Sequence, residues 1–285
     1  MVASLLRKWR MAVPSSNCRK RSRNVKVRIC RTATGRQHRE EAANPAGGGQ
    51  GVSAIYLVRH GQASFSGTDY DALSALGERQ AQILGAAFAH RGLQVAGAVC
   101  GGMQRHRQTA TACLSAMGAS VALDIDARWN EYDHNDLLAA VDTRWRNQHV
   151  LARDLLAQGD PGAAFRKVFG LAIRRWVGGA HDGDYRETWV AFQARVQAAL
   201  AAVEARLKPH ETVLVFTSGG PISMVCRDLL GLNDERTWAL NLRVVNTAVT
   251  RVVRSHGALE FAGFNAHTHL EEAQAVQGEP LVTYV

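Results

Sequence analysis

The segment from Ile55 to Gln62 constrains the fold of this chain more than any other. Four apolar residues, Ile55 to Val58, lead directly into Arg59-His60-Gly61. A short continuous apolar run bounded by turn residues is typical of a buried strand in a parallel sheet. Ligands of such sheets bind just beyond the carboxyl ends of the strands. We therefore expect Arg59 and His60 to lie at a ligand crevice, where Gly61 lets the backbone approach the ligand closely.

The rest of the chain alternates between predicted strands and helices. Apolar runs predict strands at about 53–58, 95–100, 121–125, 211–217, 243–254 and 259–264, and helical patterns lie at about 74–91, 104–117 and 222–230. This alternation predicts an α/β fold, a three-layer sandwich with a mostly parallel central sheet and helices on both faces. Residues 136–208 are mainly helical, so we expect a helical insertion over the carboxyl edge of the sheet. Residues from about 271 onward are expected to form a loose tail.

The net charge of +9 is confined to the N-terminal part of the 285-residue chain. Residues 1–50 contain 12 Lys and Arg against 2 Glu, whereas residues 51–285 contain 22 basic and 23 acidic residues. Residues 1–51 end in a Gly-rich linker, so we expect a basic, disordered extension and linker, or an over-called gene start, before a domain at 52–285. A transit peptide and a basic arm that contacts nucleic acid or acidic lipid are the alternatives.

Composition argues against several classes of protein. The five cysteines are scattered, odd in number and without a CxxC pair, so we expect neither a disulfide framework nor a zinc site, and a reducing, cytoplasmic setting fits. No apolar run approaches the roughly 18 residues needed to span a bilayer, so we expect no membrane partner. The near-neutral charge of residues 51–285 argues against nucleic acid as a partner.

Charged and nucleophilic residues follow four of the expected strands, namely Arg59 with His60, then Arg105, Glu131 and Ser218. Arginine binds phosphate bidentately and keeps its charge, and histidine can attack phosphorus and carry the phosphoryl group covalently. A carboxyl group can protonate a leaving alkoxide and then take a proton from water. Because cationic donors stabilise the charge that a metal would otherwise offset, this set favours phosphoryl transfer without a metal.

At these residues the chain resembles the histidine phosphatase superfamily, which includes the cofactor-dependent phosphoglycerate mutases and the fructose-2,6-bisphosphatases. The resemblance covers about residues 53–269. It lies in Arg59-His60-Gly61, in the segment from Tyr70 to Ala81 that follows, and in the helical segment from Arg105 to Ala110. The order and spacing of these motifs are far more specific than the first tripeptide alone.

The resemblance implies a role for each site residue. His60 would be phosphorylated, and Glu131 would be the proton donor and acceptor. The phosphoryl oxygens would be bound by a further set of residues: Arg59, Gly61, Gln62, Arg105 and Ser218.

Ser218 departs from the pattern of the family, which usually carries a second histidine, followed by glycine, after its corresponding strand. This chain has Ser218-Gly219-Gly220 there. Serine can donate one hydrogen bond to a phosphoryl oxygen but brings no positive charge. Losing one preorganised donor typically costs on the order of a hundred- to a thousandfold in rate. His106 and His134 lie close to site residues in sequence, and either could take the place of the missing imidazole.

We therefore expect a metal-independent phosphatase without a cofactor that hydrolyses a small phosphorylated substrate, a phosphomonoester, through a phosphohistidine intermediate. Two alternatives stay open. One is a catalytically weak or inactive phosphate-ligand binding or regulatory module, which Ser218 favours. The other is a phosphoglycerate mutase-type transferase, against which Ser218 and the insertion argue. Substrate specificity is expected to reside in the insertion at 136–208.

Overall fold

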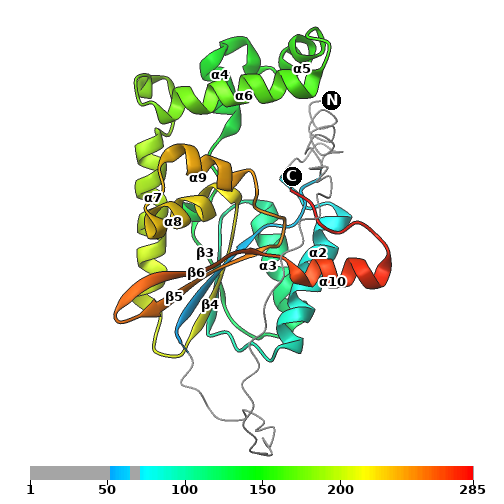
Figure 1. Ribbon diagram of the computed structural model, residues 1–285, viewed down its shortest axis with the longest axis vertical. Helices are drawn as coiled ribbons and strands as arrows, with labels where there is room; N and C mark the ends of the chain where they lie inside the picture. The colour runs from blue at the N-terminus through cyan, green and yellow to red at the C-terminus, as the bar shows by residue number, and fades with distance from the viewer. Residues whose placement is uncertain (1–51, 65–70, 285) are drawn as a thin grey trace, which may run out of the picture.

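A computed structural model describes residues 52–64 and 71–284, so the basic extension expected at 1–51 lies outside the described residues. The described chain is built around a six-stranded sheet in the order β3-β2-β4-β1-β5-β6 (Figure 1). The strands are β1 (Ala54–Arg59), β2 (Gly97–Cys100), β3 (Leu123–Ile125), β4 (Thr212–Thr217), β5 (Val249–Ser255) and β6 (Ala258–Ala266). Strands β1 to β4 are mutually parallel, and β5 is antiparallel to both β1 and β6.

Strands β1 and β4 lie at the centre of the sheet because their side chains are apolar on both faces. The fully buried apolar side chains of the two strands are Ile55, Leu57, Val58, Leu214, Val215 and Phe216. The parallel register pairs Arg59 with Thr217. Both strands therefore end at the same level, and the residues that follow, His60 and Ser218, emerge side by side.

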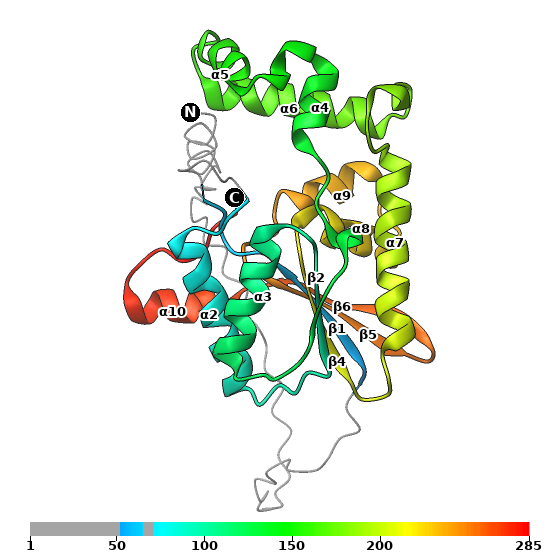
Figure 2. The ribbon, with the colours of Figure 1, turned by 180° about the vertical axis from the view of Figure 1, so that it is seen from behind.

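Helices cover both faces of the sheet (Figures 1 and 2). One face carries α2 (Ala75–His90) and α3 (Gln104–Met117), and α10 (Thr268–Gln277) lies beside α2. The other face carries α7 (Trp189–Arg206) and α8 (Gly219–Leu230), and α9 (Asp234–Asn241) lies beside α8. Helices α2 and α3 pack closely because Gly85 lies against the Cys113 carbonyl, where a Cβ would come within 2.1 Å of the oxygen. This arrangement confirms the predicted three-layer α/β class.

The predicted insertion divides into two parts. Its first part consists of α4 (His134–Val141), a 3-10 helix (Thr143–Arg146), α5 (Gln148–Leu156) and α6 (Pro161–Val177). These helices stand beyond the carboxyl ends of the parallel strands (Figure 2). Its second part, α7, runs back along the sheet and covers it, although we expected all of 136–208 over the edge. Among the described residues, none of the helices combines the length and apolar character that crossing a membrane requires.

The prediction of a loose tail from about residue 271 is wrong. Helix α10 extends to Gln277, and the segment after it packs into the domain with Leu281 fully buried. Leu281 and Leu270 share a small apolar cluster with Val245 and Ala248. The segment after α10 is thus held in place by single apolar residues that are far apart in sequence, and such contacts leave no periodic pattern from which the packing could be predicted. The strand predicted from residue 243 also begins later, at Val249.

Candidate active site

His60 directly follows β1 and is 7% exposed. Its backbone N–H donates to the carbonyl of Thr217 at 2.8 Å, which ties it to the end of β4. Its ring Nδ1 lies 2.7 Å from the Gly61 carbonyl oxygen. A carbonyl can only accept, so Nδ1 carries the proton and Nε2 of the neutral ring keeps its lone pair. Burial lowers the pKa of His60 well below its usual range, and the charges of Arg105 and Arg59 lower it further.

Arg59 and Arg105 supply the positive charge near this imidazole. Arg59, the last residue of β1, donates from Nη1 to the carbonyl oxygens of Val244 and Tyr284. Arg105 lies in the first turn of α3 and is 4% exposed. Both guanidinium groups act on the pKa of His60, so the structure brings the two predicted phosphate arginines into the field of the predicted nucleophile.

Asp71 lies at the start of α3 and offsets the charge there. One carboxylate oxygen accepts from Arg105 Nη1 at 2.6 Å, and the other accepts from the Gln104 N–H at 2.7 Å. A cation in the first turn of a helix opposes the helix dipole, and an anion at this position stabilises it. The side chain of Asp71 supplies this anion at the start of α3.

Glu131 lies between the 3-10 helix Ala127–Trp129 and α4, with its carboxyl group at the start of α8. Its Oε2 accepts from the Gly220 N–H at 3.1 Å. A Cβ on Gly220 would lie 2.0 Å from Glu131 Oε1, so only glycine permits this approach. Burial raises the pKa of Glu131, against the opposing effects of the Gly220 N–H and the two arginines. A carboxyl group with a raised pKa can hold a proton for a leaving group.

Ser218 is fully buried at the junction of β4 and α8. Its Oγ lies 2.7 Å from Nε2 of His106, which is also fully buried. The ring of His106 lies beside that of His60, with 5.7 Å between the ring centroids. Of the two histidines considered as substitutes for the missing imidazole, the structure brings His106 to Ser218, whereas the ring of His134 packs edge-on to Tyr132.

Gly61 and Gln62, both predicted to bind phosphate, use their backbone N–H groups within the protein. The Gly61 N–H donates to Thr109 Oγ1 at 3.0 Å, and the Gln62 N–H donates to Gln80 Oε1 at 2.9 Å. The side-chain oxygen of Gln62 accepts from the hydroxyl of Ser74, the residue that caps α2. These contacts shape the loop after His60, and the phosphate contacts of Gly61 and Gln62 stay predictions.

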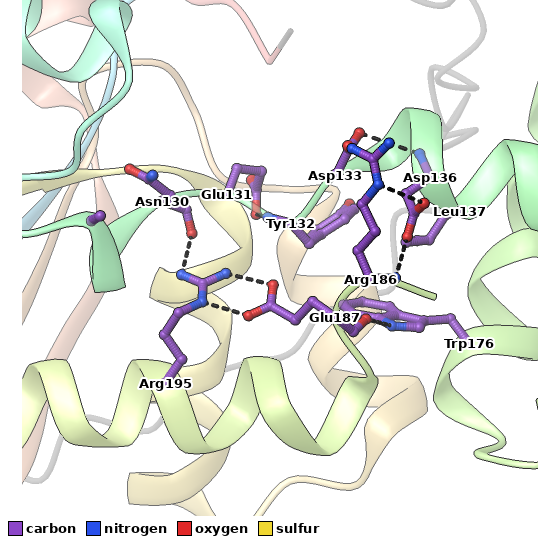
Figure 3. A pocket seen from close by; sticks show the side chains of 11 residues that line it. Asn130, Glu131, Tyr132, Asp133, Asp136, Leu137, Trp176, Arg186, Glu187 and Arg195 are labelled. Atoms are coloured by element: carbon purple, nitrogen blue, oxygen red, sulfur yellow. Dashed lines mark hydrogen bonds and ion pairs between the residues drawn. The ribbon is translucent and has the colours of Figure 1, made fainter. Parts of the chain in front are cut away.

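A cavity of about 240 Å³ lies beside Glu131, on the side of the helical insertion (Figure 3). Its lining combines acidic, basic and aromatic side chains: Asn130, Glu131, Tyr132, Asp133, Asp136, Trp176, Arg186, Glu187 and Arg195, together with Ala127 and Leu137. The helical insertion therefore contributes to a cavity that reaches the predicted proton donor.

Arg195 of α7 fixes the segment that carries Glu131 (Figure 3). Its Nη1 donates to the carbonyl oxygens of Arg128 and Asn130 at 2.8 and 2.9 Å. Its Nε and Nη2 form a two-pronged pair with Glu187 at 2.6 and 2.8 Å. No motif in the sequence marks Arg195, because its contacts are with backbone atoms more than sixty residues away.

Most of the described chain matches one known protein family. Residues 55–267 match the histidine phosphatase superfamily (branch 1). The match covers most of the chain, which therefore belongs to this superfamily, and the resemblance inferred from the motifs is confirmed. No curated protein matches the sequence.

Solved structures share the fold at low sequence identity. Phosphoglycerate mutase from Bacillus anthracis is 18% identical with a TM-score of 0.56, and the match covers 79% of this chain and 98% of that one. The alpha-ribazole phosphatase from Shigella flexneri is 20% identical with a TM-score of 0.53 over 75% and 96% of the two chains. A phosphoserine phosphatase variant from Entamoeba histolytica, solved with phosphoserine, is 16% identical with a TM-score of 0.52 over 76% and 98%.

Proposed function

We propose that this protein is a metal-independent phosphatase that hydrolyses a small phosphomonoester through a phosphohistidine formed on His60. One observation carries the proposal. The hydrogen bond from His60 Nδ1 to the Gly61 carbonyl leaves Nε2 unprotonated, in the field of Arg59 and Arg105. A neutral imidazole with one free nitrogen and two fixed cations nearby is suited to attack a phosphate ester.

The proposed reaction has two steps. In the first, His60 Nε2 forms a bond to phosphorus, the ester P–O bond breaks, and protonated Glu131 gives its proton to the leaving alkoxide. In the second, water forms a bond to phosphorus, the P–N bond breaks, and the Glu131 carboxylate takes a proton from the water. His60 and Glu131 thus return to their starting states, and the sum of the steps is ester plus water to alcohol plus phosphate.

The cavity beside Glu131 is the proposed place for the leaving group. Glu131, the residue that would protonate the departing oxygen, is one of the residues that line it. It is lined by residues of the helical insertion, such as Asp136 and Trp176. This position supports the expectation that the insertion determines which alcohol is accepted.

Turnover of p-nitrophenyl phosphate in the presence of EDTA tests the proposed function. We expect the wild-type protein to release p-nitrophenol and His60→Ala to release none above background. His90→Ala is the matched control, because His90 is an exposed residue at the end of α2. Equal rates for wild type and His60→Ala, or loss of wild-type activity in EDTA, would contradict the proposal.

A phosphate-binding module without turnover is the second candidate, and Ser218 favours it because serine brings no charge to the site. This candidate predicts that inorganic phosphate binds while His60 stays unphosphorylated. A mutase-type transferase would instead move the phosphoryl group to a second hydroxyl group. Supplying phosphoglycerate and following its isomers separates that activity from hydrolysis.

We also propose a cytoplasmic location for the protein. Cys100, Cys113 and Cys226 are free and buried among the described residues. Free thiols persist most readily where the compartment is reducing. Fractionation of cells that express the full chain tests this proposal.

A further inference from the structure

His106 and Ser218 form a buried pair directly beside His60. His106 Nε2 and Ser218 Oγ are 2.7 Å apart, and both residues are 0% exposed. The two belong to different elements, because His106 lies in the first turn of α3 and Ser218 precedes α8. The 5.7 Å between the ring centroids of His106 and His60 places the pair next to the proposed nucleophile.

The surroundings of His106 fix which of its nitrogens carries the proton. Burial, followed by the charge of Arg105, lowers the pKa of His106 well below its usual range, so the ring is neutral and has one N–H. Nδ1 is buried and has no hydrogen-bond partner among the described residues. A buried N–H without an acceptor is rarer and costlier than an unused acceptor. The proton therefore lies on Nε2, which donates to Ser218 Oγ.

This direction of the hydrogen bond determines what Ser218 can do. A hydroxyl group has one proton to donate and two lone pairs that accept. Because Oγ accepts from His106, its own proton is left for another acceptor. We infer that Ser218 donates this proton to an oxygen of the phosphoryl group bound at His60, and that His106 is the positioning residue that holds the hydroxyl in this orientation. The inference rests on the proposed function, because the phosphoryl group on His60 is the acceptor.

Two features of the fold support this role. Consecutive hydrogen bonds polarise one another, so a donor behind the serine makes its hydroxyl proton a better donor. Room for the imidazole depends on Gly101, because a Cβ there would lie 2.2 Å from His106 Nδ1. His106 thus lies one residue from the arginine proposed to bind phosphate, in a space that only glycine leaves open. The pair supplies a directed donor after β4, where the family usually has an imidazole.

Five variants, one of them the double variant Ser218→Ala/His106→Ala, test the inference with p-nitrophenyl phosphate as substrate and orthovanadate as ligand. Ser218→Ala removes the donor, and His106→Ala removes the group behind it. His106→Gln keeps an amide N–H that can still donate to Ser218. Ser223→Ala is the matched control, because it removes another buried hydroxyl of α8 that donates to the Gly219 carbonyl at 2.8 Å. Circular dichroism and Tm establish that each variant is folded.

We expect Ser218→Ala to lower kcat by about a hundred- to a thousandfold and to weaken vanadate binding similarly, with KM nearly unchanged. We expect His106→Ala to lower kcat by a factor in the same range. The kcat of the double variant should be no lower than that of Ser218→Ala, because the two residues act as one unit. His106→Gln should recover most of the activity lost in His106→Ala, and Ser223→Ala should match wild type. Wild-type kcat in Ser218→Ala, or losses that multiply in the double variant, would overturn the inference.

Vanadate binding by calorimetry separates this inference from the proposed function. If the wild-type protein binds vanadate but does not turn over substrate, the proposed function fails while the role of Ser218 is judged by affinity alone. In that case weaker binding of at least about tenfold in Ser218→Ala supports the inference, and unchanged binding overturns it. A wild-type protein that neither binds vanadate nor turns over substrate contradicts both.

Discussion

The side-chain amide of Asn246 donates a hydrogen bond to the backbone carbonyl of His60 over 3.0 Å. Asn246 is itself held by Thr283, through its N–H to the Thr283 carbonyl at 2.8 Å and through its Oδ1, which accepts from the Thr283 hydroxyl at 2.7 Å. Gln80 of α2 also donates to Thr283, at 2.9 Å. The backbone of the proposed nucleophile is therefore supported by Thr283, in the segment that follows α10.

Asn246→Ala should reduce both stability and activity. It removes the acceptor of the buried Thr283 hydroxyl proton and the side-chain donor to the His60 carbonyl, so we expect the free energy of unfolding to fall by about 1–3 kcal/mol. Unfolding in urea measures this loss, and the rate with p-nitrophenyl phosphate should fall as His60 loses its support. Gln197→Ala, which removes an exposed amide bonded to Asp228, should change stability by less than about 0.5 kcal/mol. Equal stability of Asn246→Ala and wild type would show that the network is dispensable.

Gly61→Ala should destabilise the protein because the loop after His60 packs against the start of α2. A Cβ on Gly61 would lie 2.3 Å from the Gly77 carbonyl oxygen, a backbone atom that cannot turn away. Such overpacking typically costs about 1–3 kcal/mol, which Tm and urea unfolding would detect. Gly97→Ala is the control, because a Cβ there meets no atom within 4 Å. If both variants unfolded alike, the close approach of Gly61 and Gly77 would not matter for stability.

Glu131→Gln should impair substrates according to how much their leaving group needs a proton. For an alkyl ester such as glycerol 2-phosphate, kcat/KM should fall by about a hundred- to ten-thousandfold, the usual contribution of a general acid. For p-nitrophenyl phosphate, whose leaving group departs as a stable anion, kcat/KM should fall much less. A similar loss for both substrates would mean that Glu131 supports the site without protonating the leaving group.

The pH dependence of kcat/KM should follow from the protonation states of His60 and Glu131. His60 must be neutral to attack, so activity should rise as the pH increases through its lowered pKa. Glu131 must be protonated to act as acid, so activity should fall as the pH increases through its raised pKa. A pH series with glycerol 2-phosphate measures both limbs, and Glu131→Gln should lose the alkaline limb. An alkaline limb that persists in Glu131→Gln would assign it to another group.

Stability should fall in mild acid because several histidines are buried in the neutral form. Burial lowers the pKa of His269 to about 3 and that of His134 to about 4. The unfolded chain binds protons from about pH 6.5 downward, whereas the folded chain resists protonation, so the free energy of unfolding falls as the pH drops below that value. His269→Gln should make this dependence shallower, by up to about 1.4 kcal/mol per pH unit. Urea unfolding at several pH values checks this, and an unchanged slope would contradict it.

The apolar runs of the sequence were sufficient to predict all six strands of the sheet, although the strand predicted from residue 243 begins later, at Val249. The continuous apolar runs of β1 and β4 are typical of buried strands in a parallel sheet. Helix α3 was predicted with the bounds that the structure has, Gln104–Met117. The fold class and the superfamily could therefore be predicted before any coordinates were considered.

The supporting contacts could not be predicted, because they join residues distant in sequence. Nothing in the pattern around Asn246 or Arg195 indicates that they bond to backbone atoms near His60 and Glu131. His106 and His134 were equivalent substitutes in the sequence. The orientation of α3 against β4 distinguishes them, since it directs His106 to Ser218.

Intact-mass spectrometry of the full chain, rapidly mixed with p-nitrophenyl phosphate, tests the phosphohistidine on His60 most directly. We expect a fraction of the wild-type protein to gain the mass of one phosphoryl group, in a form that is lost in acid and absent from His60→Ala. Fragmentation should place the group on His60, and NMR should place it on Nε2. Turnover by the wild-type protein without this adduct, or an adduct of equal amount in His60→Ala, would contradict the proposed mechanism.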